Sequence, residues 1–392
     1  MAKAIRPIAA KRMESLPPYL FARISQARDR MRKEGVDVID LGMGDPDLPT
    51  PSFIVQAMKR AVEDPAHHHY PTYEGMPALR EAVARWYQKR FQVDLDPERE
   101  VLVLIGSKEG LAHLPIALVN PGDVTLVPSP GYPVYGVSTL MAGGEPYFMP
   151  LLKENRFLPR LNDIPAPVAE KAKIMFLNYP NNPTAATADA PFFEGVVEFA
   201  SRWNTVVCHD AAYSEIAFDG YRPMSFLQVD GGKDVGIEIH SLSKTCNMTG
   251  WRVGFAVGNR DVIDGLRRVK SNIDSGVFQA IQIAAIEALE NYETHHSDTL
   301  GIYQRRRDLL AEGLREAGLE VQSCAATFYL WITVPKGFTS VEFATLLLSK
   351  TGIVLTPGNG FGEWGEGYIR AAFTRDENQI REAVRRLRQT TF

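Results

Sequence analysis

The chain has 392 residues, 45% of them hydrophobic, and its 47 acidic and 43 basic side chains give a formal net charge of −4. This composition allows two or three packed domains, excludes a disordered chain and leaves no large basic excess for nucleic acid or an anionic membrane. Residues 1–20 are basic but lack the apolar core of a signal peptide, and no apolar run approaches the roughly 20 residues that span a bilayer. We therefore expect a cytoplasmic protein that binds neither nucleic acid nor membrane.

Between about residues 100 and 260, short apolar runs alternate with helical stretches. Continuous apolar runs are typical of strands covered on both faces, and their alternation with helices predicts a mainly parallel sheet. The predicted strands are 101–105, 124–127, 174–177, 205–208, 236–239 and 254–257, and helices are predicted at 111–119 and 191–203.

After about residue 260 the pattern becomes α+β. Helices are predicted at 261–291, 297–317, 340–350 and 377–388, and strands at 319–322, 327–333, 353–355 and 368–373. We expect an N-terminal arm and part of a small domain in residues 1–46, a large domain in 47–290 and a small C-terminal domain in 291–392.

Several common sites are excluded. Cys208, Cys246 and Cys324 are too widely spaced for a disulfide framework or a cysteine zinc site, and we interpret them as buried free thiols. No phosphate-loop or G-x-S-x-G motif occurs. The letters G-x-G-x-x-G at 360–365 lead into a predicted strand, whereas a dinucleotide fingerprint opens a helix.

Chemically capable residues collect at the ends of the predicted strands. The segment HSLSKT places Lys244 among small hydroxyl side chains, and Arg252 follows in GWRVG. This grouping favours a phosphate site beside a reactive amine. A second anion site is predicted at GSKEG, where Ser107 would cap a helix whose free amide groups point outward.

Two further segments follow predicted strands. NYPNNPT contains Asn182, and HDAAY contains Asp210 and Tyr213. A phosphate site, an amine and a carboxylate together fit pyridoxal 5′-phosphate (PLP), because its protonated ring nitrogen needs an anionic partner. Each of these residues alone would be interpreted as a turn former or a solvated lysine, so the hypothesis depends on the combination.

Together these segments resemble the class I/II aminotransferases, which are PLP-dependent enzymes of fold type I. The resemblance covers nearly the whole chain, through LGMGDPDLPTP, YPTYEGMPALR, PGYPVY, SLSKTCNMTGWRVGF and YIRAAF. It implies an α/β fold: a large domain with a mainly parallel seven-stranded sheet, plus a smaller α+β domain. LPPYLFARI, GSKEGLAHLPIALVNPGDV and KSNIDSGVFQA are most similar to LL-diaminopimelate aminotransferases and their alanine-transaminase relatives.

The resemblance also implies a role for individual residues. Lys244 would bind PLP covalently and then shuttle a proton, and Asp210 would pair with the ring nitrogen. Asn182 and Tyr213 would hydrogen-bond the ring oxygen. The residues expected around the rest of the cofactor are Tyr132 on the ring face, Ser107, Lys108, Ser241, Ser243 and Arg252 on the phosphate, and Tyr70 reaching the phosphate of a partner subunit in a homodimer. The residues expected to bind the substrate are Gly44, Asn182 and Arg370, whose guanidinium would clamp the α-carboxylate.

The implied reaction moves an amino group from an amino acid to a 2-oxo acid by general acid–base catalysis. LL-2,6-diaminopimelate and 2-oxoglutarate are the expected pair, since Tyr73, Glu74 and Asn272 are candidates to meet a distal group that carries both charges. An alanine, aspartate or broad-specificity aminotransferase and a PLP-dependent C–S lyase remain alternatives.

Two positions depart from the family pattern. Ala185 stands where the family motif has glycine, and a positive φ there would cost about 1 kcal/mol. Cys246 stands where near relatives carry tyrosine, and it could alter the packing beside the cofactor.

Overall fold

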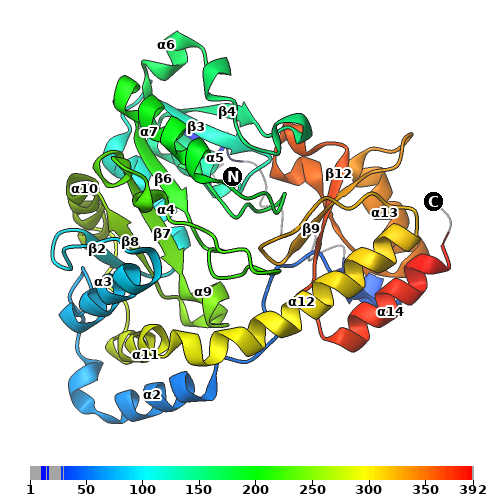
Figure 1. Cartoon of the computed structure of the whole chain (residues 1–392), viewed down its shortest axis with the longest axis horizontal. Coiled ribbons are helices and arrows are strands. Elements are labelled where there is room, and N and C mark those ends of the chain that lie inside the picture. The colour runs from blue at the N-terminus through cyan, green and yellow to red at the C-terminus, as the bar shows by residue number, and fades with distance from the viewer. Residues whose placement is uncertain (1–9, 15, 17–27, 30, 391–392) are drawn as a thin grey trace, which may run out of the picture.

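The computed structural model describes residues 10–14, 16, 28–29 and 31–390. In Figure 1 the elements around a central sheet lie on the left and the C-terminal elements lie on the right. Helix α12 (Tyr292–Glu316) runs along both groups. Among the described residues, no helix is long and apolar enough to cross a membrane.

The described residues contain a seven-stranded sheet with the order β2-β8-β7-β6-β5-β3-β4. Strand β8 is antiparallel to its neighbours β2 and β7, and the other pairings are parallel. The mainly parallel sheet is therefore confirmed. Its strands are β2 (Val101–Leu104), β3 (Val124–Ser129), β4 (Glu145–Pro150), β5 (Ala172–Leu177), β6 (Val206–Asp210), β7 (Gly236–Ser241) and β8 (Gly254–Gly258).

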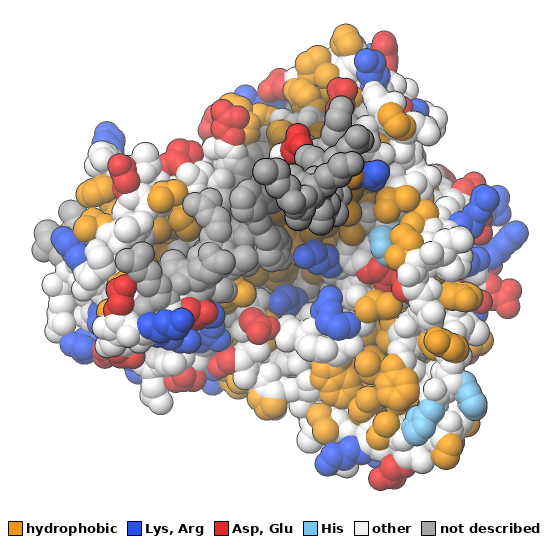
Figure 2. Space-filling view, turned by 180° about the vertical axis from the view of Figure 1, so that it is seen from behind, with side chains coloured by type: hydrophobic (Ala, Val, Ile, Leu, Met, Phe, Trp, Pro, Cys, Tyr) orange, Lys and Arg blue, Asp and Glu red, His pale blue; other side chains and the backbone are white. Residues whose placement is uncertain are grey.

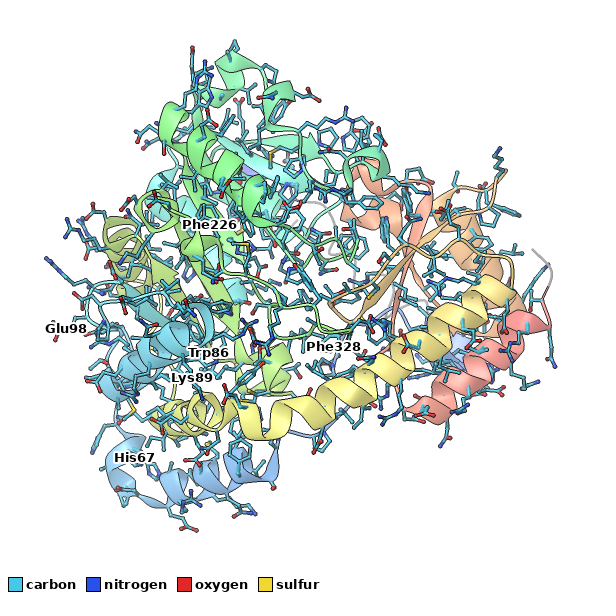
Figure 3. All side chains as sticks on the ribbon, in the orientation of Figure 1. His67, Trp86, Lys89, Glu98, Phe226 and Phe328 are labelled. Atoms are coloured by element: carbon cyan, nitrogen blue, oxygen red, sulfur yellow. The ribbon has the colours of Figure 1, made fainter. Side chains whose placement is uncertain are left out.

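Helices cover both faces of this sheet. Successive strand side chains point to opposite faces, so Val101 and Val103 join one core while Leu102 and Leu104 join another. The first core is covered by α2 (Ser52–Glu63), α3 (Pro77–Phe91), α7 (Ala190–Trp203) and α11 (Gln279–Glu290), and the second by α4 (Ser107–Leu118), α5 (Val134–Ala142) and α10 (Arg260–Ser271). Trp86 and Phe226, labelled in Figure 3, belong to the first core.

The C-terminal elements enclose a core of their own, which includes Phe328 (Figure 3). In the described part of the chain, β11 (Thr356–Pro357), β12 (Tyr368–Ala372) and β9 (Tyr329–Thr333) form an antiparallel sheet. Strand β1 (Ile39–Asp40) pairs with β10 (Ile353–Val354). The chain before the large sheet therefore contributes a strand to the C-terminal elements. Helices α13 (Ser340–Thr351) and α14 (Glu377–Arg388) complete this part. The domain boundaries expected from the sequence, at residues 46 and 290, remain a prediction.

The remaining short helices connect these elements. They are α6 (Ala166–Ala169), α8 (Gly232–Val235) and α9 (Leu242–Thr245), with 3₁₀ turns η1 (Lys11–Met13), η2 (Pro65–His68), η3 (Lys153–Asn155), η4 (Leu161–Asp163), η5 (Phe226–Gln228), η6 (Thr249–Trp251), η7 (Gly358–Phe361) and η8 (Glu363–Gly365).

Two expectations about local structure are wrong, and one strand was not predicted. The single helix predicted at 261–291 is divided into α10 and α11, because Gly276 takes a φ of +85° in the turn between them. The strand predicted at 319–322 reduces to an isolated bridge between Val321 and Ile332. Strand β4 was not predicted, because it has an exposed edge and contains two prolines rather than a continuous apolar run.

Candidate active site

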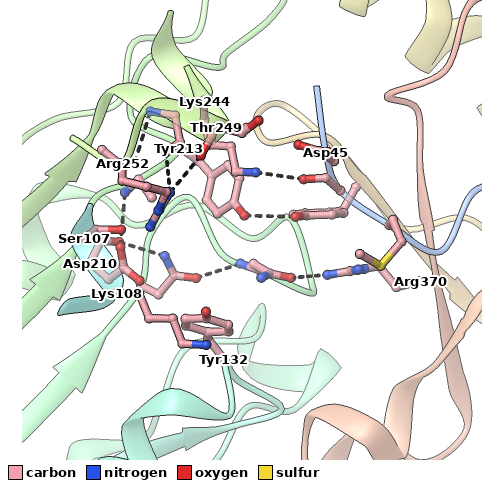
Figure 4. A pocket seen from close by; sticks show the side chains of 18 residues that line it. Asp45, Ser107, Lys108, Tyr132, Asp210, Tyr213, Lys244, Thr249, Arg252 and Arg370 are labelled. Carbon is pink, nitrogen blue, oxygen red and sulfur yellow. Dashed lines mark hydrogen bonds between the residues drawn. The ribbon is translucent and has the colours of Figure 1, made fainter. Parts of the chain in front are cut away.

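The carboxyl ends of the parallel strands open on a cavity of about 350 Å³. Asp210 ends β6 and Ser241 ends β7, whereas Ser107 and Tyr132 follow β2 and β3. Twelve predicted site residues line the cavity: Gly44, Ser107, Lys108, Tyr132, Asn182, Asp210, Tyr213, Ser241, Ser243, Lys244, Arg252 and Arg370. Figure 4 shows Ser107, Lys108 and Arg252 on one side of Tyr213 and Arg370 on the other.

One end of the cavity is built for an anion. Helix α4 begins at Ser107, and its first amide groups lack helical acceptors. A Cβ on Gly106 would clash with the Arg252 guanidinium, so this charge lies directly over the helix start. Arg252 Nη1 donates to Ser243 Oγ at 3.4 Å and to the Thr249 carbonyl at 2.9 Å. Hydroxyl, amide and guanidinium groups therefore lie together at the start of α4.

The Lys244 amine lies in the middle of the cavity. Its Nζ donates to the Gly44 carbonyl at 2.8 Å, so the backbone that follows β1 holds it in place. Burial lowers the pKa of Lys244, and the positive charges of Arg370 and Arg252 act in the same direction. The unprotonated amine, which is the nucleophilic and basic form, is thus populated closer to neutral pH.

Asp210 is a buried carboxylate at the bottom of the cavity, with 5% of its surface exposed. Its Oδ2 accepts from Tyr135 Oη at 2.8 Å, and its Oδ1 accepts a long bond of 3.4 Å from the Ala212 amide. Burial raises the pKa of Asp210, although the Tyr135 hydrogen bond and the charge of His209 oppose the shift. A carboxylate in this position is stabilised by a cation placed in the cavity.

A hydrogen-bonded cluster supports Asp210 from behind. Glu238 Oε2 contacts His209 Nδ1 at 2.8 Å, and its Oε1 contacts His240 Nε2 at 2.9 Å and accepts from Tyr87 Oη at 2.8 Å. Burial opposes ionisation of Glu238, but the bonds from His209 and His240 lower its pKa strongly. Because His209 and His240 directly precede Asp210 and Ser241, this cluster fixes the ends of the two strands that carry them.

Arg370 on β12 forms the other end of the cavity and is 1% exposed. Its Nη1 donates to Asn182 Oδ1 and its Nη2 to the Gly42 carbonyl, both at 2.7 Å. The guanidinium carbon lies 4.1 Å from the ring centre of Tyr329 and 4.7 Å from that of Phe361. The plane of the charged group is therefore held by aromatic contacts and by hydrogen bonds.

The NYPNNPT loop joins these two ends. Asn178 Nδ2 donates to the Asp210 carbonyl at 2.7 Å, and Asn178 Oδ1 accepts from the Asn182 amide at 2.8 Å. Ala185 in the same loop is buried with φ +59°. Alanine at this positive φ carries the backbone strain of about 1 kcal/mol expected from the sequence. The loop thus places Asn182 between Asp210 and Arg370.

Sequence reasoning missed several lining residues: Met43, Asp45, Asn178, Ala212, Thr249 and Tyr329. Tyr329 is the most informative of them, because its Oη lies 2.9 Å from Tyr213 Oη and its ring lies under Arg370. A Cβ on Gly44 would clash with the Tyr329 hydroxyl, so glycine is required there. The only sequence signal was an aromatic in a predicted strand, which is usually a core residue.

Some candidates lie outside this cavity. Tyr70 is 88% and Tyr73 45% exposed, and neither these two nor Glu74 and Asn272 line it. Cys246 is buried in the first core and lines a separate small cavity with Ile54 and Tyr292 rather than the active-site cavity.

The cavity fits PLP. An anion site at a helix start suits its phosphate, the buried Asp210 suits a protonated ring nitrogen, and the Lys244 amine lines the same cavity. Residues 36–387 match the model of the family "Aminotransferase class I and II". The chain belongs to this family. It is a PLP-dependent aminotransferase, and the predicted family, fold class and cofactor are confirmed.

Individual relatives agree over almost the full length. The "LL-diaminopimelate aminotransferase" of Syntrophobacter fumaroxidans is 57% identical over 385 residues, which cover 98% of this chain and 99% of the relative. The protein of the same name from Halothermothrix orenii is 56% identical, with 97% and 98% covered. A solved structure described as substrate-bound BacF from Bacillus subtilis is 39% identical and superposes with a TM-score of 0.94 over 98% of both chains.

The Tyr329 ring provides a test of how Arg370 is held. We expect Tyr329→Leu to raise KM for amino-acid and 2-oxo-acid substrates about tenfold or more, since a desolvated cation–π contact contributes roughly 2 kcal/mol. Tyr329→Phe keeps the ring and should show a much smaller rise. Steady-state kinetics of both variants at saturating PLP checks this, and an unchanged KM in Tyr329→Leu would contradict it.

Proposed function

We propose that this aminotransferase moves the amino group of LL-2,6-diaminopimelate to 2-oxoglutarate, and that it acts as a cytoplasmic homodimer. The observation that carries the reaction class is the presence of Lys244, Asp210 and Arg370 in one cavity. The names of the relatives at 57% and 56% identity support the choice of donor.

When bound, PLP supplies an aldehyde that captures the donor's amino group and a ring that withdraws electrons from the α-carbon. Lys244 Nζ would remove the α-proton of the donor and later deliver a proton to the carbon of the cofactor that carried the aldehyde. Its lowered pKa favours the unprotonated form that accepts a proton. Asp210 would hold a proton on the ring nitrogen, and Tyr213 Oη and Asn182 would donate to the ring oxygen.

Arg370 would orient the donor through its α-carboxylate. Its guanidinium is already fixed by Asn182, Gly42 and the aromatic rings, so little side-chain freedom is lost when a carboxylate binds. Ser107, Lys108, Ser241, Ser243 and Arg252 would hold the phosphate at the opposite end, with Tyr132 on the ring face. Anchors at both ends would place the α-carbon beside Lys244.

The role of Asp210 can be separated from simple cofactor retention. Asp210→Asn should slow exchange of the donor's α-deuterium by about 10²-fold or more, because a neutral amide does not keep a proton on the ring nitrogen. PLP affinity should change much less. The two quantities are measured by NMR exchange and by PLP titration, with Asp264→Asn on the exposed side of α10 as control. An unchanged exchange rate would exclude this role.

The homodimer is supported by exposed hydrophobic side chains around Tyr70. Tyr70 is 88% exposed, and Tyr73 and Ile273 are 45% and 54% exposed in adjoining segments. Figure 2 shows hydrophobic side chains gathered on the lower part of the face seen from behind. Exposed aromatic residues of this kind are typical of protein interfaces.

Mixing inactive variants tests shared sites. A mixture of Lys244→Ala and Tyr70→Ala proteins should regain on the order of a quarter of wild-type activity, since half of randomly paired dimers are hybrids with one intact site of two. Lys244→Ala mixed with Asp210→Ala should stay inactive, because both residues belong to the same chain's cavity. Full activity of a protein that sediments only as a monomer would refute the dimer.

The identity of the preferred amino-group donor can be tested directly. LL-diaminopimelate should exceed alanine and aspartate at least tenfold in kcat/KM with 2-oxoglutarate, because buried polar partners left unpaired by a smaller donor cost about 1–3 kcal/mol. Glu74→Gln should reduce this preference while leaving alanine turnover similar, with Glu74 acting from the partner subunit. A tenfold advantage for alanine would replace the proposal with a general transaminase. Release of pyruvate and thiol from a sulfur amino acid would favour a C–S lyase.

A further inference from the structure

Lys270 is a fully buried lysine outside the active-site cavity. It lies in the last turn of α10, and its side chain is 0% exposed. Its Nζ donates to both carboxylate oxygens of Glu109, at 3.0 and 3.1 Å, and to Asp274 Oδ1 at 2.7 Å. Burying an ammonium is unfavourable unless it is paired and hydrogen-bonded. The contacts of Lys270 meet this requirement with two carboxylates.

The same carboxylates resemble a metal site. Glu109, His113 and Asp274 form a group of close ligand atoms, the one group of this kind found among the described residues. The Lys270 ammonium, however, bonds both carboxylates of the group, and a metal ion would have to displace it. The positive charge at this place is therefore supplied by the chain itself.

On one side Lys270 supports the start of α4. Glu109 lies in the first turn of α4, and its Oε2 accepts from the Ile105 amide at 2.5 Å. The backbone between these residues carries Ser107 and Lys108, which line the cavity. Burial opposes ionisation of Glu109, but His113, Lys270 and the Ile105 amide together lower its pKa. The ionised Glu109 carboxylate thus bonds the backbone at the start of the Ile105–Glu109 turn, and Lys270 holds that carboxylate in place.

On the other side Lys270 supports the turn between α10 and α11. Asp274 Oδ1 also accepts from the Gly276 amide at 2.8 Å. Gly276 has φ +85°, and a Cβ there would lie 2.9 Å from the Thr72 carbonyl. Thr72 lies two residues after Tyr70, and the backbone carbonyl of Glu74 accepts from the Val103 amide of β2 at 3.0 Å. Lys270 therefore links the α4 turn to the segment that carries Tyr70.

We propose that Lys270 is a positioning residue for the phosphate of PLP: it fixes the Ile105–Glu109 turn so that the donors of Ser107 and Lys108 point at the phosphate. The inference rests on the proposed placement of that phosphate at the start of α4. Lys270 touches neither cofactor nor substrate, so it acts on affinity through the turn. Its effect must therefore be larger for a ligand with a phosphate than for the same ligand without one.

The test compares PLP with pyridoxal, which lacks the phosphate. Lys270→Met removes the charge at similar length and should raise the dissociation constant of PLP for the apoprotein about tenfold or more, comparable to the loss when the hydrogen-bond partner behind a metal ligand is removed. The dissociation constant of pyridoxal should change less than about threefold. Both are read from absorbance or fluorescence titration, with the melting temperature of the apoprotein recorded beside them.

The control is Arg307→Met. Arg307 is 8% exposed and pairs with Asp219, whose side chain is 56% exposed, so its loss also removes a buried cation from an ion pair far from Ser107 in the chain but should leave PLP affinity unchanged. If Lys270→Met does not fold, Asp274→Asn replaces it, since asparagine can still accept from the Gly276 amide. This variant should weaken PLP binding in the same direction by a smaller factor.

The outcomes are distinct. A selective loss of PLP affinity over pyridoxal affinity supports the inference. PLP affinity unchanged within about twofold in the variant that folds, or an equal loss for PLP and pyridoxal, overturns it. Failure of the wild-type protein to bind PLP or to transaminate would instead refute the proposed function.

Discussion

The phosphate end of the cavity depends on the pairing of Gly254 at the start of β8. Gly254 lies opposite Ser241 of β7 on one side and opposite Leu104 of β2 on the other. A Cβ there would lie 2.5 Å from the His240 carbonyl and 3.1 Å from the Ser107 amide, so only glycine allows this approach. Because β8 is antiparallel to β7, it begins at the edge of the sheet where β7 ends, and residues 242–253 stay at that edge. The segments that carry Lys244 and Arg252 therefore lie beside the start of α4.

The cavity concentrates charges that are unfavourable when buried alone. Asp210 and Arg370 are each 5% exposed or less, and burial shifts the pKa of each toward its neutral form. Asp210 at the bottom and Arg370 at the far end are complementary to a cation and to a carboxylate respectively. A cofactor with a protonated ring nitrogen and a substrate with an α-carboxylate meet both requirements. The buried charges that destabilise the fold without ligands thus determine which ligands it binds.

Much of the site could be predicted from the sequence, because its residues lie in short segments at strand ends. Once the strands are parallel, the end of β6 and the end of β7 meet at one edge, and Asp210 and Ser241 come with them. Tyr329 and Lys270 could not be predicted in this way. Their partners, Arg370 and Glu109, lie 41 (370 − 329) and 161 (270 − 109) positions away in the chain, and the pairing depends on tertiary packing. Strand β4 and the break at Gly276 were missed because local apolar patterns do not encode edge strands or positive-φ turns.

Lys270 and Glu238 show two ways in which the fold places charge behind a site. Glu238 is a buried anion that accepts from Tyr87 and contacts His209 and His240, and it fixes the strands that carry Asp210 and Ser241. Lys270 is a buried cation between carboxylates, and it fixes the turn that carries Ser107. Each group is satisfied by fixed partners and is therefore rigid. Rigid supports behind opposite parts of the cavity keep the ring-nitrogen partner and the phosphate donors at a constant separation, which a ligand of fixed length such as PLP requires.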